Sequence, residues 1–282
     1  MDTQPRVALI QFPGSNCEWE TKRAAEAAGI SCDVFRWNRD PQALTEYAGY
    51  IIGGGFSYQD RVRAGAIACK EPIMKTVFDE VTGDGKPVIG ICNGAQVLVE
   101  AGLVPGIDVG NVQMALAPNL SYPKGRIAQF WCRWVFVKQV SDPGRCAFTG
   151  NYEKDEVIPI PIAHGEGRFT TADPDVLQAL KANDQIVFQY CDVDGNVEDT
   201  REINPNGAME NIAAICNPQG NVMAVMPHPE RASFLRQIPA EIGGPWAQKK
   251  IEAYGDAEAL NSPGPGLAVF ESMAEQLATV TA

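Results

Sequence analysis

The stretch that decides the fold is Lys86-Pro-Val-Ile-Gly-Ile-Cys-Asn-Gly-Ala-Gln96. Its segment Val88-Ile-Gly-Ile91 is mostly β-branched and apolar, which is typical of a strand buried on both faces. The strand pattern stops at Cys92, and a helix-compatible segment, Ala95 to Ala101, follows at once. This order predicts a strand, a sharp turn that carries a cysteine, and a helix.

Cys92 lies between two glycines, Gly90 and Gly94, each two residues away. The spacing parallels the nucleophile elbow G-x-S-x-G, with sulfur in place of the hydroxyl, because small neighbours let the chain reverse without clashes. A thiol beside a helix N-terminus is favoured in its thiolate form, which is the form that attacks carbon. The alternative interpretation is a buried structural cysteine, as most free cysteines are.

Composition narrows the classes of function. The 282 residues include 35 acidic and 23 basic ones, for a net charge of -12. Without a Lys/Arg-rich run, nucleic-acid binding has little to drive it, so we expect no nucleic-acid partner. The first residues do not follow the basic-then-apolar pattern of a signal peptide, and no apolar run is long enough to span a bilayer. We therefore expect a soluble, cytoplasmic protein without membrane contact.

The eight cysteines never form a C-x-x-C pair, so we expect them to stay reduced. A zinc site is not expected, because the chain has two histidines, His164 and His228. If Cys92 needs an imidazole to accept its proton, these two are the candidates.

Strands and helices alternate in the first half of the chain, and this alternation predicts an α/β fold, a mostly parallel doubly wound sheet flanked by helices. Chemistry in such sheets gathers at the carboxyl ends of the strands. Ser15 or Asn16 is expected to cap the first helix. The predicted strands are 6–12, 30–37, 50–52 and 88–91, and the predicted helices are 17–28, 67–81 and 95–101.

The second half has a looser pattern. We expect a single domain over 1–282, with an extended, irregular segment rich in Gly and Pro at about 234–262, and a closing helix at 267–277. Further strands are predicted at 129–139, 158–162 and 186–191, with a hairpin of 212–216 and 222–226 and a helix at 176–183.

Pro227-His-Pro-Glu230 predicts a partner for the cysteine. Each proline fixes its own φ and pushes the preceding residue toward extended geometry. Because residues two apart in an extended chain face the same side, His228 and Glu230 are expected to lie together. A carboxylate beside an imidazole fixes its tautomer, as in a catalytic triad. The alternative is a solvated turn that carries a His and a Glu.

Gly53-Gly-Gly55 follows another predicted strand and offers backbone N–H groups unobstructed by side chains. With the N–H of Asn93 it would make an oxyanion hole. A phosphate-binding loop is a weaker alternative, since neither glycine-rich phosphate motif is present. A plain structural turn is the third interpretation.

Taken together, these blocks resemble the class I (triad-type) glutamine amidotransferases, and more narrowly the glutaminase subunits of phosphoribosylformylglycinamidine synthases. The two parts that mark the broader class are Gly90 to Gln96 and His228-Pro-Glu230. The narrower resemblance rests on further blocks in the family's order: Phe12 to Cys17, Gly54 to Tyr58 with Asp60, Arg63 to Ile67, Ile162 to Arg168 and Met226 to Arg231.

The resemblance implies hydrolysis of glutamine to glutamate and ammonia through a thioester. Cys92 would be the nucleophile, His228 the general base and acid, and Glu230 the group that orients His228. Residues implied in substrate binding and the oxyanion hole are Gly54, Gly55, Phe56, Asn93, Gln96, His164 and Gly165. His164 is the weaker base candidate, because it has no carboxylate at a matching offset.

The same resemblance implies partners. Ammonia would pass to a synthase subunit that makes formylglycinamidine ribonucleotide in purine biosynthesis. ATP and Mg are expected on that partner, and a small bridging subunit is expected in the complex. No cofactor or metal is expected in this chain. The alternatives are a class I amidotransferase subunit that serves another synthase, a non-catalytic regulator on the same fold, and a thiol peptidase. Gln59 stands where the family commonly has glycine, which leaves the shape of the oxyanion loop open, and Ala95 is smaller than usual.

Overall fold

The fold is taken from a computed structural model, which describes residues 5–121, 126–127 and 130–280. Within these residues, nine strands form one sheet in the order β2-β1-β3-β4-β13-β12-β11-β8-β9. The strands are β1 (Arg6–Gln11), β2 (Ser31–Arg36), β3 (Gly49–Ile52), β4 (Val88–Ile91), β8 (Trp131–Gln139), β9 (Val157–His164), β11 (Ile186–Cys191), β12 (Ile212–Cys216) and β13 (Val222–Val225). The predicted strands are therefore all present. Gln129, the first residue of one of them, lies outside the described residues.

Strand direction decides where functional groups can meet. β2, β1, β3, β4 and β13 are mutually parallel. β12 and β8 run against them, and β11 and β9 each reverse again, as the antiparallel pairs β12–β13, β11–β12, β11–β8 and β8–β9 require. Of the nine strands of this sheet in the described residues, seven thus point the same way. The predicted mostly parallel α/β sheet is confirmed, and the carboxyl ends of β1, β3, β4, β13 and β9 share one edge.

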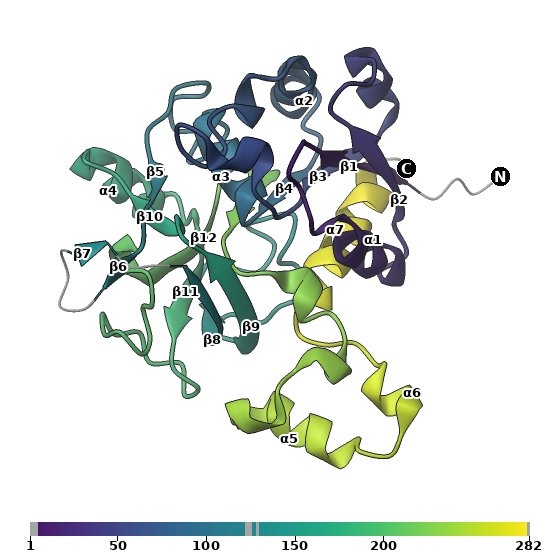
Figure 1. The fold of residues 1–282 in the computed structure, drawn as a ribbon, viewed down its shortest axis with the longest axis vertical. Helices are drawn as coiled ribbons and strands as arrows, with labels where there is room; N and C mark the ends of the chain where they lie inside the picture. The colour runs from purple at the N-terminus through teal and green to yellow at the C-terminus, as the bar shows by residue number, and fades with distance from the viewer. Residues whose placement is uncertain (1–4, 122–125, 128–129, 281–282) are drawn as a thin grey trace.

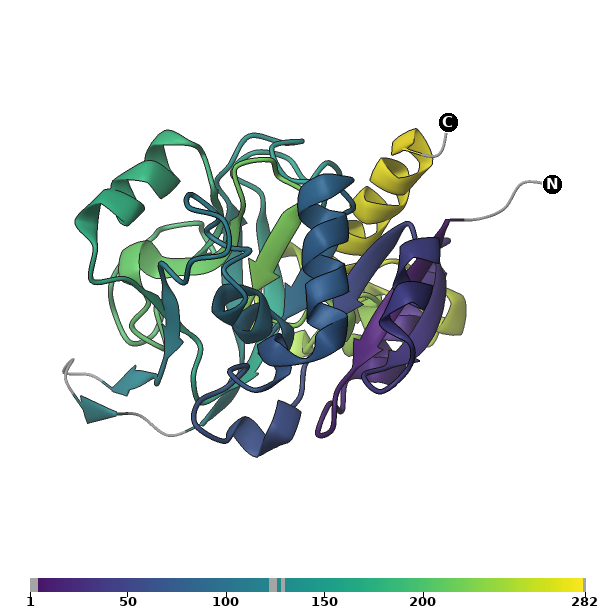
Figure 2. The same ribbon diagram turned by 90° about the horizontal axis from the view of Figure 1, so that it is seen from above.

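Helices cover both faces of the parallel strands. Figure 1 shows α2 (Pro72–Gly83) and α3 (Asn93–Glu100) on one side of β1, β3 and β4, with α1 (Glu18–Ala27) and α7 (Leu267–Val280) on the other. Figure 2, turned by 90°, shows the same two layers about the sheet. β3 and β4 are buried along their whole length, which explains their unbroken apolar sequences.

Two helix starts differ from the prediction. The N-cap residue of α1 is Cys17, without a side-chain cap; Ser15 Oγ accepts instead from the N–H of Phe12, and Asn16 Oδ1 accepts from Cys17 Sγ. The helix expected from residue 67 is a 3₁₀ turn, Ala68–Lys70, followed by α2 from Pro72. Glu71 is extended between them because the residue before a proline avoids helical geometry.

Smaller elements complete the second half of the chain. β5 (Ala115–Ala117) pairs antiparallel with β10 (Arg168–Thr170), and β6 (Leu120–Ser121) pairs with β7 (Arg126–Ile127). α4 (Pro174–Ala182) precedes β11 and is capped by Asp173, whose side chain accepts from the N–H of Asp175. The pairing of β5 with β10 places the chain after residue 115 beside the turn that follows β9.

The segment 234–262 is not irregular, which corrects the expectation. It contains α5 (Gly244–Glu252) and α6 (Ala257–Leu260), and Figure 1 shows both in a lobe that projects from the sheet. Pro245 lies in the first turn of α5, where its missing N–H costs nothing, and Asp256 caps α6. Its glycines and prolines therefore mark helix ends rather than a continuous loop.

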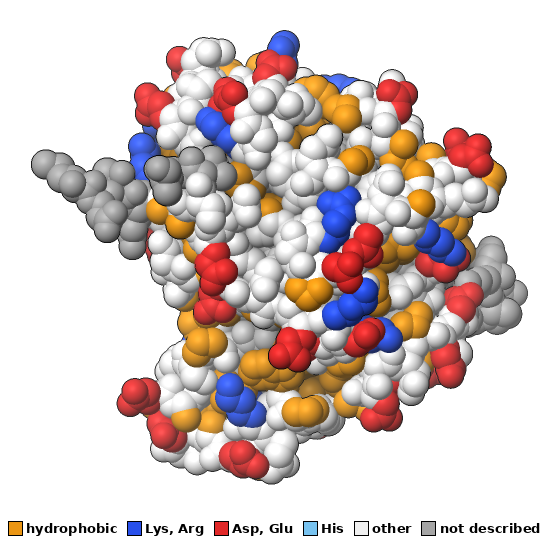
Figure 3. Space-filling view, turned by 180° about the vertical axis from the view of Figure 1, so that it is seen from behind, with side chains coloured by type: hydrophobic (Ala, Val, Ile, Leu, Met, Phe, Trp, Pro, Cys, Tyr) orange, Lys and Arg blue, Asp and Glu red, His pale blue; other side chains and the backbone are white. Residues whose placement is uncertain are grey.

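The surface carries mixed charge. On the face in Figure 3, Lys and Arg side chains lie among Asp and Glu side chains, with apolar side chains between them. None of the helices in the described ranges is long and apolar enough to cross a membrane.

Candidate active site

Cys92 lies at the sharp turn between β4 and α3. Its backbone has φ 51° and ψ -105°, a conformation that L residues rarely adopt and that is typical of functional sites. A Cβ on Gly94 would lie 1.9 Å from the carbonyl oxygen of Ile52, and one on Gly90 would lie 2.4 Å from that of Gly94. Both positions therefore require glycine, and the predicted nucleophile elbow is present.

The sheet brings the second motif to Cys92. β13 is the parallel neighbour of β4, with Val225 beside Ile91. The N–H of Cys92 donates to the carbonyl oxygen of Val225 at 2.8 Å, and the N–H of His228 donates to that of Pro161 in β9 at 2.8 Å. Because neighbouring parallel strands end at the same edge, His228 emerges next to the elbow.

His228 and Glu230 form a buried pair. Nδ1 of His228 lies 2.5 Å from Oε1 of Glu230, and both residues are 1% exposed. The contact was predicted, but the expected backbone was wrong. His228 is extended, whereas Pro229–Arg231 forms a 3₁₀ turn that swings the carboxylate back toward the ring.

The charge state of His228 follows from its surroundings. Burial alone lowers the pKa of an imidazole, but the carboxylate of Glu230 and the sulfurs of Cys92 and Cys17 outweigh burial and raise the pKa of His228 well above its ordinary value. Among the described residues, Nε2 of His228 has no hydrogen-bond partner, and Cys92 Sγ instead contacts the carbonyl oxygen of Ala163 at 3.4 Å. The imidazolium is therefore stabilised by the nearby thiol, although no hydrogen bond of good geometry joins the two side chains.

The glycine loop after β3 packs tightly against the site. Gly55 has φ 149°, and a Cβ there would lie 2.6 Å from Cα of Ser15. A Cβ on Gly54 would lie 2.8 Å from Cε1 of His228 and 2.9 Å from Sγ of Cys17. Because Gly54 lies against the imidazole and Gly55 follows it, the loop can present backbone groups to an atom bound at Cys92.

Phe56 follows the glycine loop and is 43% exposed. Its N–H already donates to the carbonyl oxygen of Gly14, at 2.9 Å. Its ring lies 6.1 Å from that of Phe130, and Gly165 lies beside Phe130, where a Cβ would be 3.8 Å from the ring. Phe56 and Gly165 are thus on the same apolar rim.

Asn93 and Gln96 form a buried amide chain under the elbow. Asn93 Oδ1 accepts from the N–H of Ser57 at 3.1 Å, and Asn93 Nδ2 donates to Gln96 Oε1 at 2.9 Å. Gln96 Nε2 then donates to the carbonyl oxygen of Glu166 at 2.6 Å. Both ends of the Gln96 amide are engaged, so Gln96 ties the turn after β9 to α3.

His164, at the end of β9, is buried and neutral. Burial and the nearby His228 lower its pKa to about 3. Its Nδ1 lies 3.1 Å from Oδ1 of Asn119, and Asn119 Nδ2 donates to the His164 carbonyl oxygen at 2.8 Å. An amide in place of a carboxylate gives no charge to stabilise an imidazolium, which agrees with its ranking as the weaker base.

Sequence reasoning gave no role to several residues that the structure places here. Cys17 Sγ accepts from Arg231 Nη2 at 3.1 Å, and Arg231 Nε donates to Glu20 Oε1 at 2.8 Å. Burial and the nearby Glu166 raise the pKa of Asp60 to about 6. Cys17 follows the first strand, whose end shares the edge with that of β4, so the sheet topology was the available signal.

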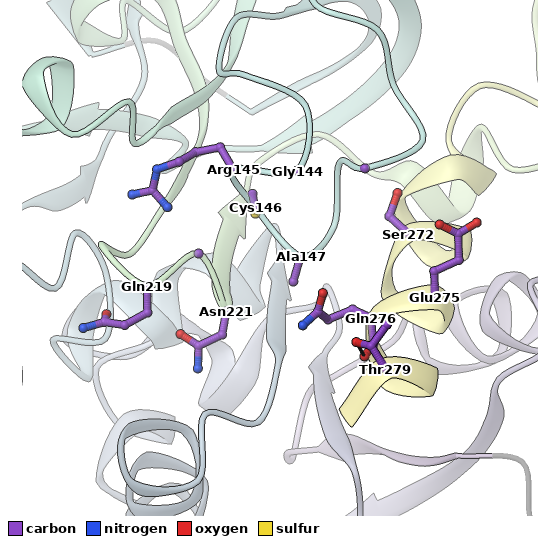
Figure 4. Close-up of a pocket in the computed structure, with 12 residues that line it drawn as sticks. Gly144, Arg145, Cys146, Ala147, Gln219, Asn221, Ser272, Glu275, Gln276 and Thr279 are labelled. Atoms are coloured by element: carbon purple, nitrogen blue, oxygen red, sulfur yellow. Dashed lines mark hydrogen bonds between the residues drawn. The ribbon is translucent and has the colours of Figure 1, made fainter. Parts of the chain in front are cut away.

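A hollow lies away from Cys92, between the turn before β13 and α7. Figure 4 shows Arg145 and Gln219 on one side of it and Ser272 and Glu275 on the other. The Arg145 guanidinium is already engaged: Nε donates to Asn183 and Nη2 to Pro218, both at 3.0 Å. Asn221 also lines the hollow, and its carbonyl oxygen accepts from the first residue of β4, so this is the amino edge of the sheet, away from Cys92.

A family model and several curated proteins match this chain over most of its length. A family model described as a CobB/CobQ-like glutamine amidotransferase domain matches residues 4–272. A phosphoribosylformylglycinamidine synthase subunit PurQ from Methanothrix thermoacetophila is 45% identical over 270 residues, which span 95% of this chain and 96% of that protein. The subunit PurQ from Pyrococcus furiosus is 43% identical over 228 residues, or 81% of this chain and 89% of that protein.

Two solved structures contain chains that are similar to this one over nearly its whole length. A chain in the structure of PurLQS from Thermotoga maritima superposes with a TM-score of 0.68 and 32% identity, covering 97% of this chain and 99% of that one. The glutaminase domain of CTPS from Trypanosoma brucei, solved with bound acivicin, has a TM-score of 0.55 at 13% identity, covering 96% and 94% of the two chains, and is similar in fold alone.

Proposed function

Because the chain belongs to the CobB/CobQ-like glutamine amidotransferase family and, within it, to the phosphoribosylformylglycinamidine synthase subunits named PurQ, we propose that it hydrolyses glutamine to glutamate and ammonia for such a synthase. The observation that carries the proposal is the 2.5 Å pair of His228 and Glu230, placed by β13 beside the strained elbow of Cys92. This is the arrangement that thiol-dependent acyl transfer requires.

In the proposed reaction, the Cys92 thiolate attacks the side-chain amide carbon of glutamine, and the proton from the thiol resides on His228. The imidazolium gives this proton to the departing nitrogen, so ammonia leaves and a thioester remains. His228 then takes a proton from water, hydroxide cleaves the thioester, and glutamate and the free thiol are restored. Glu230 holds the Nδ1–H tautomer and stabilises the charged ring throughout.

We assign the developing oxyanion to backbone N–H groups of Asn93 and of the Gly54-Gly55 turn. Asn93 is the first residue of α3, where the N–H groups have no partner within the helix. Losing one such donor typically costs about 3–4 kcal/mol of transition-state stabilisation. Gln96, Phe56, His164 and Gly165 are proposed to line the substrate pocket, with Gln96 acting through the turn at Glu166 that it holds in place.

The ammonia is proposed to pass to a synthase subunit that converts formylglycinamide ribonucleotide to the amidine, with ATP and Mg bound there and not on this chain, and with a small bridging subunit in the complex. The PurLQS likeness supports a multi-subunit assembly. A cytoplasmic location is proposed as well. The eight cysteines all lie in the described part of the chain and all are free there, as a reducing compartment allows.

A glutaminase assay on Cys92→Ala tests this function, with Cys132→Ala as the matched control because Cys132 is exposed on β8. We expect Cys92→Ala to lose at least about 1,000-fold in kcat, as removal of a triad nucleophile does, while the control retains its rate. A glutamine-like chloroketone should label Cys92 stoichiometrically. Retained activity in Cys92→Ala would refute the mechanism, and product formation only with a different synthase would reassign the partner.

A further inference from the structure

We propose that Cys17, His228 and Glu230 form a binding site for Zn²⁺ and that a zinc ion bound there switches the enzyme off. Metal binding stands independently of the function proposed above, and only its effect on activity rests on that function. The scarcity of histidine argued against a zinc site from the sequence. A site of this kind needs one imidazole, and the fold places a thiol and a carboxylate beside it.

The geometry suits a tetrahedral cation. Within the described residues, these three side chains each offer one ligand atom, and the three atoms lie within 4.8 Å of one another. Ligand atoms about 2.0–2.3 Å from a tetrahedral zinc are separated by roughly 3.3–3.8 Å. Side-chain adjustments of about 1 Å therefore close the site, and sulfur, nitrogen and oxygen are the donors that zinc prefers.

One of the three buried donor residues, Glu230, has an oxygen without a partner in the described part of the chain, whereas Cys17 Sγ already contacts Asn16 and Arg231. Cys17, His228 and Glu230 are each 1% exposed, and Oε2 of Glu230 has no hydrogen-bond partner among the described residues. An unpaired carboxylate oxygen at this depth is costly, and a bound cation would satisfy it. This orphaned oxygen is a sign of an unfilled site that is independent of the clustering itself.

Charge also balances. Burial raises the pKa of the Cys17 thiol, so binding of the metal must release the thiol proton to solvent. The resulting thiolate and the carboxylate of Glu230 together neutralise a divalent cation. Arg231, whose Nη2 donates to Cys17 Sγ at 3.1 Å, has its own charge paired with Glu20 at 2.8 Å. An N–H donor to a metal-bound thiolate is a common outer contact that orients the sulfur. A nearby cation also weakens binding, which makes the site reversible rather than structural.

Binding at this site would disable His228. Cys17 Sγ and a ring nitrogen of His228 lie within 4.8 Å of each other, and the Cys17 side chain contributes to the raised pKa of His228. A zinc ion shared with Cys17 would replace the Nδ1 proton that now lies on the 2.5 Å contact with Glu230. The ring could then no longer become an imidazolium held by that carboxylate, so it could not stabilise the Cys92 thiolate or protonate the leaving ammonia.

Cobalt(II) serves as the spectroscopic probe of the site, and the titration is made on Cys92→Ala so that the nucleophile cannot supply sulfur. We expect one equivalent of Co²⁺ to give tetrahedral d–d bands and a thiolate-to-cobalt charge-transfer band, and one equivalent of Zn²⁺ to remove them. The double variant Cys17→Ser/Cys92→Ala should lose the charge-transfer band. Absence of that band in Cys92→Ala, or its survival in the double variant, would overturn the assignment.

Inhibition is measured on chains that retain Cys92, each compared with its own activity without metal. The Zn²⁺ concentration that halves glutaminase activity should rise at least about tenfold in Cys17→Ser, since loss of even an indirect contact costs that much. Cys69→Ser, a buried cysteine on another element, is the matched control and should respond like the parent chain. Equal inhibition of parent and Cys17→Ser would place the zinc on Cys92 and refute the site. If neither chain turns over glutamine, the proposed function fails while the cobalt spectrum still decides the site.

Discussion

At the scale of single residues, the sequence predicted the backbone of the Cys92 turn correctly and that of the His228–Glu230 pair only in part. Gly90 and Gly94 were a reliable sign of the elbow. A Cβ on either residue would lie within 2.4 Å of a backbone atom, so no other residue fits there. The contact of His228 with Glu230 was predicted from two prolines, yet it forms through a 3₁₀ turn. A proline fixes its own φ but leaves ψ free, so the direction of residue 230 was not determined locally.

Asp60, which follows the glycine loop after β3, makes the stability of the protein depend on pH. Burial, with the repulsion of Glu166, raises the pKa of Asp60 to about 6, against about 3.9 in an unfolded chain. A carboxyl group with a raised folded pKa contributes stability below its unfolded value, and this contribution is lost as pH rises through 6. The charged form at neutral pH is therefore the destabilising one.

Asp60→Asn should consequently stabilise the protein at pH 7.5 and not at pH 4. The expected gain is about 1 kcal/mol in the free energy of unfolding, after allowing for the exposed half of the side chain. Urea unfolding at the two pH values measures it, and Asp79→Asn, on an exposed pair in α2, is the control. A gain of the same size at pH 4 would show that the charge of Asp60 is not its cause.

At the scale of elements, the lobe of α5 and α6 is joined to the body at one base. Phe234 forms a β-bridge with Pro263, and the N–H of Leu235 donates to the carbonyl oxygen of Ser262 at 3.0 Å. Gln237, at that base, donates from Nε2 to the carbonyl oxygen of Glu230 at 3.2 Å. The base thus supports the triad backbone, and α5 makes a further contact with the body at Gly244, where a Cβ would lie 2.9 Å from the Val193 side chain.

Replacing residues 240–260 by a short Gly-Ser linker should therefore leave the fold and the glutaminase site intact. The deletion removes the buried side chains of Ala247 and Ala253 and four half-buried ones that pack on the core, so we expect Tm to fall by about 5–10 °C. The four are Ile242, Trp246, Ala259 and Leu260. Differential scanning calorimetry and labelling of Cys92 by the chloroketone measure the two properties. Gln237→Ala is the contrasting variant, and it should slow labelling more than the deletion does. Loss of folding on deletion would show that the lobe is part of the core.

The lobe is also where sequence reasoning about elements failed. Its Gly-Gly-Pro run and its later glycine read as loop, although Pro245 begins a helix and Asp256 caps another. In the first half of the chain, strands β1, β3 and β4 are buried on both faces, so their composition alone identified them. Elements that lie at the surface carry no such apolar signal, and their ends are marked by the same residues that mark loops.

At the scale of the whole molecule, strand direction is what assembles the site. β4 delivers Cys92, β13 delivers His228 and β9 delivers His164, all to one edge, although β9 is separated from β13 by three strands in the order of the sheet. The N–H of His228 reaches Pro161 in β9, so the edge is curved back on itself. This closure depends on four antiparallel pairs, of which the sequence predicted one, the hairpin of β12 and β13.

In the isolated chain, the thiol of Cys92 and the imidazole of His228 are nevertheless not aligned with each other. Cys92 Sγ contacts the carbonyl oxygen of Ala163 at 3.4 Å, and Nε2 of His228 has no hydrogen-bond partner in the described ranges. Glu230 and Cys92 raise the pKa of His228, so thiol and imidazole already interact, but no hydrogen bond of good geometry joins them. A small movement of the Ala163 segment or of the elbow would make it.

We therefore expect weak glutaminase activity from the chain alone and a rise of at least about tenfold in kcat when the synthase subunit binds, since a misplacement of about 1 Å costs up to 100-fold. The measurement is ammonia release with and without the synthase and its nucleotide substrates, together with the rate at which the chloroketone labels Cys92. Both rates should rise together if docking aligns thiol and imidazole. Equal rates with and without the partner would mean that the contact forms unaided, and a rise in ammonia release without faster labelling would place the effect at a later step.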